Sequence, residues 1–226
     1  VYKRQGRTLI VTDGTFSMDG TTCALEELLP LAQEHNAWLM VDEAHSLGVR
    51  GRDGRGLVDP DCYGTDDVQV LIGTLGKALG TQGGFVAGDD GLIETLIQAA
   101  RTYIYTTALP AAVAAATLVS LRILREDAWR RERLEQLITQ FRNGATELGL
   151  ELMDSTTPIQ PVLVGDPEAA VNLSKTLEEA GVLITAIRPP TVPAGTARLR
   201  ITLTAAHTDT DVEQQLTALA QATGKE

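Results

Sequence analysis

The sequence predicts an α/β fold in which a mostly parallel sheet is followed by a smaller α/β domain. Four short apolar runs in the first 90 residues are nearly continuous, which is typical of parallel strands covered on both faces. An amphipathic helical segment lies between the first two runs. The final third has strands and helices of its own, and one of its strands alternates strictly between polar and apolar residues.

Each element of the first half follows from its local pattern. The spacing of leucines over 25–32 predicts a helix with one buried face, and Pro30 should lie in an early turn or kink this helix. Residues 50–67 contain four glycines and five aspartates, which predicts a surface loop. A helix is expected at 89–100. The apolar runs predict strands at 8–12, 37–41, 68–72 and 84–87.

In the second half, Pro110 opens a long helical region that extends to about Gly149 and is interrupted near Asp127. Its alanine-rich start and charged continuation indicate a connector between domains. Arg198, Arg200, Thr202 and Thr204 alternate with apolar residues, so one face of that strand should be polar. We expect strands at 160–165, 182–187 and 197–204, and helices at 167–180 and 209–222.

Composition excludes several classes of function. The chain has 226 residues, is 43% hydrophobic and 22% charged, and carries a formal net charge of -11, which disfavours nucleic acid and membrane surfaces as partners. No secretory signal or membrane-spanning run is visible, so a cytoplasmic protein is expected. Cys23 and Cys62 indicate reduced thiols, and the three histidines are too scattered to indicate a metal site.

Lys77 and Asp42 are the most informative residues. Asp42 ends one apolar run, and Lys77 lies in a glycine-lined turn after the next run. Pyridoxal phosphate needs such a pair, because a lysine amine forms a Schiff base with its aldehyde and a carboxylate pairs with its protonated pyridine nitrogen. Thr74 offers a hydroxyl suited to a phosphate, and His45 follows Asp42 by three residues.

Two other interpretations compete with this one. A lysine in a glycine-rich turn is usually a solvated loop residue, and an aspartate after an apolar run is often a cap or turn residue. The segment 39–45 also resembles the second nucleotide motif of helicases, but Ala78 stands where a phosphate loop needs serine or threonine after its Gly-Lys pair. The combination of Lys77, Asp42 and their neighbours favours the cofactor interpretation.

Several motifs carry a resemblance to the α-oxoamine synthases, which are pyridoxal-phosphate enzymes with the aspartate-aminotransferase fold. The resemblance covers about residues 7–219 and implies a fold type I large domain, present in part at 1–115, and a small C-terminal domain at 116–226. The Arg-Pro-Pro run favours the branch of the family that works in biotin synthesis. The motifs are Val11–Gly20 (VTDGTFSMDG), Val41–His45 (VDEAH), Gly73–Lys77 (GTLGK) and Ala186–Pro193 (AIRPPTVP).

The resemblance also implies a role for each residue that matches a family motif. Lys77 would bind the cofactor and move the substrate proton, and Asp42 would pair with the pyridine nitrogen. The other matching residues would contact either the ring oxygen and phosphate of the cofactor or the acyl and carboxylate groups of the substrates. Ser17 and His45 would contact the ring oxygen, Thr74 the phosphate, Thr107 the phosphate of a partner subunit, Arg188 and Thr191 the acyl substrate, and Arg200 the amino-acid carboxylate.

The activity implied is a decarboxylative condensation of L-alanine with a pimeloyl thioester, carried by coenzyme A or acyl-carrier protein, in a homodimer. Two alternatives stay open: a sister enzyme such as glycine C-acetyltransferase, and a non-catalytic truncated fragment. The family's phosphate-cradling turn and its ring-stacking residue are not found between Val1 and Glu226. We therefore expect an N-terminally truncated fragment that holds the cofactor weakly by itself.

Overall fold

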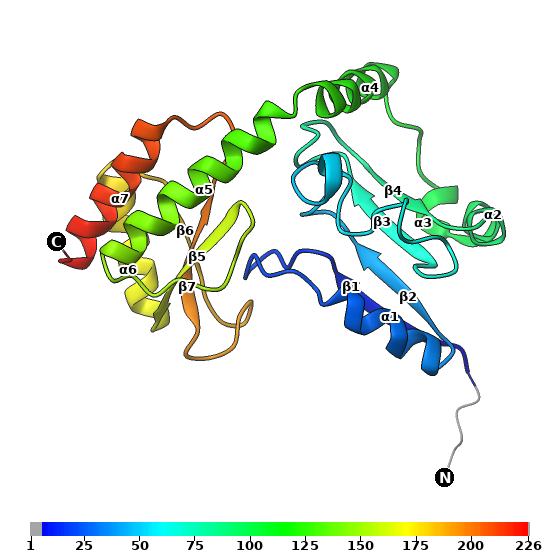
Figure 1. The fold of residues 1–226 in the computed structure, drawn as a ribbon, viewed down its shortest axis with the longest axis horizontal. Helices are drawn as coiled ribbons and strands as arrows, with labels where there is room; N and C mark the ends of the chain where they lie inside the picture. Colours follow the sequence, from blue (N-terminus) through cyan, green and yellow to red (C-terminus); the bar gives the residue numbers. More distant parts are fainter. Residues whose placement is uncertain (1–5, 226) are drawn as a thin grey trace, which may run out of the picture. The chain divides into compact units, whose positions relative to one another are not determined.

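A computed structural model describes residues 6–225, and these form two compact units (Figure 1). The first unit contains the described residues up to Thr15 together with Thr22–Ala128. The second contains Phe16–Thr21 and the chain from Trp129 onward. The segment Phe16–Thr21 therefore packs with a part of the chain that lies more than a hundred residues later in the sequence. The predicted domain boundary at 115/116 stays a prediction.

The first unit is built on a four-stranded sheet in the order β1-β2-β3-β4. β1 pairs with β2 and β2 pairs with β3 in parallel, whereas β4 runs antiparallel to β3. The connection 75–83 is too short for a parallel crossover, so the chain returns in the opposite direction. The strands are β1 (Thr8–Asp13), β2 (Ala37–Asp42), β3 (Val70–Thr74) and β4 (Gly84–Ala87).

Helix α1 (Leu25–Glu34) covers one face of this sheet. Its buried Leu25, Leu29 and Ala32 pack in one cluster with Leu39 and Val41 of β2. Pro30 lies on the exposed side of α1 in its second turn, rather than in the first. Burying these side chains is the main force that holds α1 to the sheet.

The opposite face of the sheet differs from the expectation of cover on both sides. Leu9 and Val11 of β1 are 49% and 60% exposed. No helix or strand in the described part of the first unit covers these two side chains. The apolar sequence of β1 therefore predicted the strand correctly. Only one face of the strand is covered, and the face with Leu9 and Val11 is exposed.

The remaining helices of the first unit follow the sheet. The carboxylate of Asp89 accepts the Leu92 N–H at 2.6 Å and caps α2 (Asp90–Ala99). A short helix, α3 (Arg101–Ile104), was not predicted, and η1 (Arg52–Gly54) forms a single turn in the predicted surface loop. α4 (Ala111–Glu126) starts after Pro110 and ends directly before Asp127, so the predicted interruption is confirmed.

The second unit has a three-stranded antiparallel sheet in the order β5-β7-β6. β7 is its central strand, which places the arginine-bearing strand inside the sheet. The predicted helices and strands are all present, with β6 and β7 shorter than predicted. The elements are α5 (Trp129–Glu147), β5 (Ile159–Gly165), α6 (Pro167–Glu179), β6 (Thr185–Ile187), β7 (Ala197–Thr202) and α7 (Asp209–Thr223).

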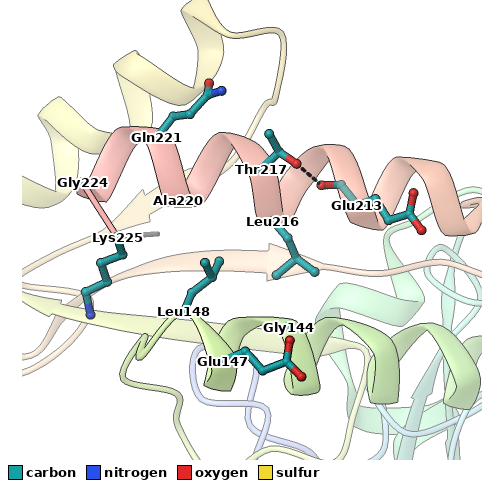
Figure 2. Close-up of a pocket in the computed structure, with 10 residues that line it drawn as sticks. All are labelled: Gly144, Glu147, Leu148, Glu213, Leu216, Thr217, Ala220, Gln221, Gly224 and Lys225. Atoms are coloured by element: carbon teal, nitrogen blue, oxygen red, sulfur yellow. Dashed lines mark hydrogen bonds between the residues drawn. The ribbon is translucent and has the colours of Figure 1, made fainter.

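Helices α5 and α7 approach closely at Gly144. A methyl group at Gly144 would lie 2.4 Å from a methyl carbon of Leu216, which Figure 2 shows directed from α7 toward α5. A larger residue at Gly144 would therefore require the Leu216 side chain to shift. A shallow hollow of about 600 Å³ lies along α7 and beside the C-terminal end of α5, lined among others by Glu147, Glu213 and Lys225.

The described residues also lack a membrane-spanning helix and a metal-binding cluster. None of the helices among residues 6–225 is long and apolar enough to cross a membrane. The same residues contain no cluster of three or more histidine, cysteine or acidic side chains arranged to hold a metal ion. Cys23 is half-buried and Cys62 is exposed, and neither forms a disulfide in the structure.

Candidate active site

The turn that follows β3 presents Lys77 to solvent. Leu75 donates its N–H to the Gly83 carbonyl at 2.9 Å, and Thr81 donates to the Leu75 carbonyl at 2.8 Å. Gly80 donates to the Lys77 carbonyl at 2.9 Å and has φ of 63°, a conformation that favours glycine. These bonds hold the backbone of the turn while the Lys77 side chain stays exposed.

Two side chains of α4 hold this turn through hydrogen bonds. Ser120 donates its hydroxyl to the Leu79 carbonyl at 2.6 Å, and the hydroxyl of Thr117 donates to that of Thr81 at 2.9 Å. Leu79 itself is buried. The sequence analysis did not identify these hydroxyl groups, whose only signal was polar residues within an alanine-rich helix. They fix the position of the turn that carries Lys77.

Thr74 lies at the end of β3, inside the same turn. Its hydroxyl donates to the Gly83 carbonyl at 3.1 Å and accepts the Gly76 N–H at 3.4 Å. The adjacent Gly73 has no room for a side chain, because a Cβ there would lie 2.3 Å from the ring of Phe85. The start of the turn is therefore set by a close contact between β3 and β4.

Asp42 ends β2, next to β3. The Ala44 N–H donates to Oδ1 of Asp42 at 2.8 Å, and the Gly14 N–H donates to the Asp42 carbonyl at 2.8 Å. Asp42 lies on the face of the sheet opposite α1, because Leu39 and Val41 occupy the α1 face and side chains alternate along a strand. Its carboxylate is thus oriented by its own turn at the carboxyl end of a parallel strand.

Glu43 and His45 continue the same segment. Glu43 is 2% exposed, and its Oε1 accepts the N–H groups of Leu57 at 2.6 Å and Val58 at 2.7 Å. This carboxylate ties the end of β2 to the loop before β3. His45 is half-buried in the turn that follows Asp42.

A second carboxylate, Asp13, ends β1 directly beside Asp42. The two residues are paired in the parallel register of β1 and β2. Burial and the neighbouring Asp42 raise the pKa of Asp13, while the charge of Lys77 acts in the opposite direction. The sequence analysis included Asp13 in the motif Val11–Gly20 but assigned it no role, although its position directly after the predicted strand 8–12 was a signal.

In the second unit, Arg200 of β7 and Ser17 lie together. Nε of Arg200 donates to the Ser17 carbonyl at 2.6 Å, and its Nη1 donates to the Thr202 hydroxyl at 3.1 Å. Burial lowers the pKa of the Arg200 guanidinium. The structure thus joins two of the predicted site residues that are 183 positions apart.

Arg198 has a different environment from Arg200. It is 3% exposed, pairs with the carboxylate of Asp19 and donates from Nε to the Thr196 carbonyl at 2.9 Å. The predicted polar face of β7 is therefore not a solvated edge at this position. A buried arginine needs such partners, because an unpaired charge in the interior is costly.

The other predicted site residues are exposed. Thr191 donates its backbone N–H to the Arg188 carbonyl at 3.0 Å, so these two residues share one turn, in which the Pro189–Pro190 peptide bond is cis. Thr107 is exposed in the segment between α3 and α4. A cavity of about 890 Å³ in the first unit, between the loop before β3 and α4, has none of the predicted site residues in its lining.

Comparison with known proteins supports the motif-based resemblance. An 8-amino-7-oxononanoate synthase of Nitrosococcus oceani is 61% identical over 95% of this chain and 57% of its own length. The synthase of Pseudomonas putida strain F1 is 59% identical over 97% of the chain and 56% of its length. The chain therefore spans about half the length of the curated relatives it matches.

Solved structures agree with the fold. A lysine-to-alanine variant of serine palmitoyltransferase from S. paucimobilis, with a bound PLP–myriocin aldimine, aligns with a TM-score of 0.89 and 32% identity. The alignment covers 96% of this chain and 55% of that one. An 8-amino-7-oxononanoate synthase from Francisella tularensis aligns with a TM-score of 0.84 and 32% identity, over 98% and 64% of the two chains.

These similarities confirm the predicted fold class, which is that of the fold type I enzymes. The profile of one family, described as "Aminotransferase class I and II", matches residues 2–219. Nearly the whole chain is covered by that match, and the segments with Asp42 and Lys77 lie within it. The chain belongs to the class I and II aminotransferase family.

Proposed function

We propose that the natural protein containing this chain uses pyridoxal phosphate to condense L-alanine with a pimeloyl thioester, giving 8-amino-7-oxononanoate in biotin biosynthesis. The observation that carries this proposal is the placement of Asp42 and the Lys77 turn. They lie at the carboxyl ends of the neighbouring parallel strands β2 and β3, where α/β sheets bind ligands. Relatives at about 60% identity with the corresponding name support the choice of reaction.

The groups at these strand ends fit the cofactor chemically. Lys77 offers an exposed primary amine on a turn fixed by α4, and Asp42 offers a carboxylate oriented through one oxygen. Thr74 offers a hydroxyl in the same turn. When bound, pyridoxal phosphate supplies an electron-withdrawing ring that stabilises negative charge on the α-carbon of an amino acid.

Each residue then has a definite task. Lys77 Nζ would bind the cofactor aldehyde, and the freed amine would take the proton from the α-carbon of L-alanine and return a proton to the product. The Asp42 carboxylate would keep the proton on the pyridine nitrogen. Thr74 would bind the phosphate, Ser17 and His45 would contact the ring oxygen, and Thr107 would bind the phosphate held by the other subunit of a homodimer.

Arg200 is proposed to hold the carboxylate of L-alanine. Its guanidinium is already held by Ser17 and Thr202, so its planar fork is ordered before substrate arrives. Orientation of the carboxylate contributes more to rate than affinity alone. Arg188 and Thr191, in their exposed turn, are proposed to contact the acyl substrate.

The overall reaction conserves atoms and electrons without an added oxidant or reductant. The alanine α-carbon loses its proton and forms a bond to the thioester carbonyl carbon, while the carbon–sulfur bond breaks and the carrier leaves as a thiol after taking a proton. The alanine carboxylate leaves as CO₂, and a proton replaces it. The carrier thiol is either coenzyme A or acyl-carrier protein.

An amine and thioester screen tests this proposal against the sister reactions. The natural protein, supplied with pyridoxal phosphate, is assayed with L-alanine, glycine and L-serine, each with pimeloyl and acetyl thioesters. We expect product with L-alanine and the pimeloyl thioester. A preference for glycine with the acetyl thioester would assign the protein to the glycine C-acetyltransferase type. No product with any pair would favour a non-catalytic protein.

A further inference from the structure

We propose that Asp13 is a positioning residue of the cofactor centre: its carboxylate places a second negative charge beside Asp42, so that the Asp42 carboxylate holds a protonated pyridine nitrogen more tightly. The proposal rests on the proposed function, because it concerns the same site. It assigns a task to a residue that the motif comparison left without one.

The register of β1 and β2 places the two carboxylates side by side. Asp13 pairs with Asp42, just as Leu9 pairs with Trp38 earlier on the same strands. Neighbouring strands lie about 4.8 Å apart, and paired residues direct their side chains to the same face. Asp13 therefore shares with Asp42 the face opposite α1.

The backbone around both residues is fixed. The Gly14 N–H, immediately after Asp13, donates to the Asp42 carbonyl at 2.8 Å, so the two strand ends are joined beyond the last pair. Gly14 has no space for a side chain, because a Cβ there would lie 2.6 Å from Oε2 of Glu43. Asp13 consequently has little freedom to move away from Asp42.

The charged groups around Asp13 come from several elements. Asp42 on β2 and the burial of Asp13 raise its pKa, whereas Lys77, beyond β3, lowers it. Cys23 also faces this charge: burial, then Glu43, and to a smaller extent Asp13 raise the pKa of its thiol. The strand ends thus concentrate negative charge, which a cation bound between Lys77 and the two aspartates would neutralise.

The direction of the pKa shift of Asp13 helps to distinguish a role in ligand binding from a role in stabilising the fold. A carboxyl group whose pKa is raised by folding destabilises the folded state at neutral pH, and the destabilisation disappears as pH falls through the folded pKa to the unfolded one. The raised pKa of Asp13 therefore predicts that its charged form costs stability at neutral pH when no ligand is bound. A pyridinium ion bound next to the pair would attract both carboxylates. It would therefore favour the charged form of Asp13 and lower its pKa.

The test measures binding of 4′-deoxypyridoxine 5′-phosphate, which has the pyridine ring and phosphate but no aldehyde, to the natural protein by isothermal titration calorimetry. Asp13→Asn should weaken binding by roughly 3–30-fold near neutral pH, and Asp13→Glu should restore most of the affinity. Asp66→Asn is the matched control, since Asp66 is exposed on the loop before β3. The affinity difference between wild type and Asp13→Asn should shrink as the buffer is acidified.

Thermal unfolding of the ligand-free variants completes the test. We expect the Tm of Asp13→Asn to equal or exceed that of wild type. Equal affinity of wild type and Asp13→Asn would overturn the inference, and so would weaker binding accompanied by a lower Tm, because that pattern indicates a structural role. If wild type bound the probe no better than inorganic phosphate, the proposed function itself would fail.

Discussion

Oδ1 of Asp42 accepts the backbone N–H of Ala44 at 2.8 Å, so the carboxylate is oriented by the turn in which it lies. One oxygen is used by the protein, and we assign the other to the pyridine nitrogen of the cofactor. An asparagine at this position keeps a carbonyl oxygen for Ala44 but offers a neutral amide to the ring. The effect of that substitution should therefore lie in chemistry more than in folding.

The first prediction compares Asp42→Asn with Glu43→Gln. We expect Asp42→Asn to lower kcat by about 10²-fold or more with little change in Tm, because the ring loses its charged partner. Glu43 is buried and accepts two backbone N–H groups, so Glu43→Gln should lower stability by about 1–3 kcal/mol while each folded molecule stays active. Steady-state kinetics and thermal melts check both. Similar losses of kcat in the two variants would contradict the assignment.

The second prediction concerns the two arginines of the second unit. Arg200→Lys keeps a charge but loses the planar fork, and should raise KM for L-alanine by about tenfold or more. Arg188→Lys, in the exposed turn shared with Thr191, should mainly raise KM for the pimeloyl thioester. Kinetics with each substrate varied in turn distinguish these effects. The reverse pattern, with Arg188 governing alanine, would mean that the roles are exchanged.

The third prediction tests the contact that starts the lysine turn. Gly73→Ala would place a methyl group against the ring of Phe85 and should destabilise the protein by about 1–3 kcal/mol. Gly76→Ala is the matched control, because its Cβ would have only an ordinary contact, 3.5 Å from the Thr81 carbonyl oxygen. Urea unfolding of the two variants provides the comparison. Equal stabilities would show that the Phe85 ring moves aside easily.

The fourth prediction is a pH dependence at the start of α7. Asp211 accepts hydrogen bonds from the backbone and hydroxyl of Thr208, which lower its pKa. A carboxyl group with a lowered folded pKa stabilises the protein above its unfolded pKa, near 3.8, and this stabilisation is lost as pH falls through the folded pKa. Asp211→Asn should therefore be less stable than wild type at pH 7, and the difference should diminish in acid. A difference independent of pH would argue against this carboxylate as its source.

The sequence predicted the elements well wherever a single local pattern decided the outcome. The apolar runs located all four strands of the first unit, and the Pro110 and Asp127 signals located the ends of α4. Arg198 shows where a local pattern is insufficient: alternation placed it on a polar face, but its burial depends on Asp19, which lies 179 residues away. Asp13 was missed for the same reason, since only strand pairing brings it beside Asp42.

The support of the lysine turn by Ser120 and Thr117 likewise required the fold. Serine and threonine within a helix usually bond to their own helix or to water, and the sequence does not reveal a partner 36 or 41 residues away. By contrast, Lys77 and Asp42 were recognisable because each follows a strong strand pattern directly. Lys77 and Asp42 could thus be predicted from local patterns, whereas Asp13 and the residues that support the lysine turn through side-chain contacts could not.

Reduction with sodium borohydride tests the central claim most directly. The natural protein is saturated with pyridoxal phosphate, reduced, digested and analysed by mass spectrometry for the lysine that carries the cofactor. We predict a single labelled peptide containing Lys77, and no label in that peptide when the reduction precedes addition of the cofactor. A label on Lys175, Lys225 or any other lysine in place of Lys77 would contradict the account.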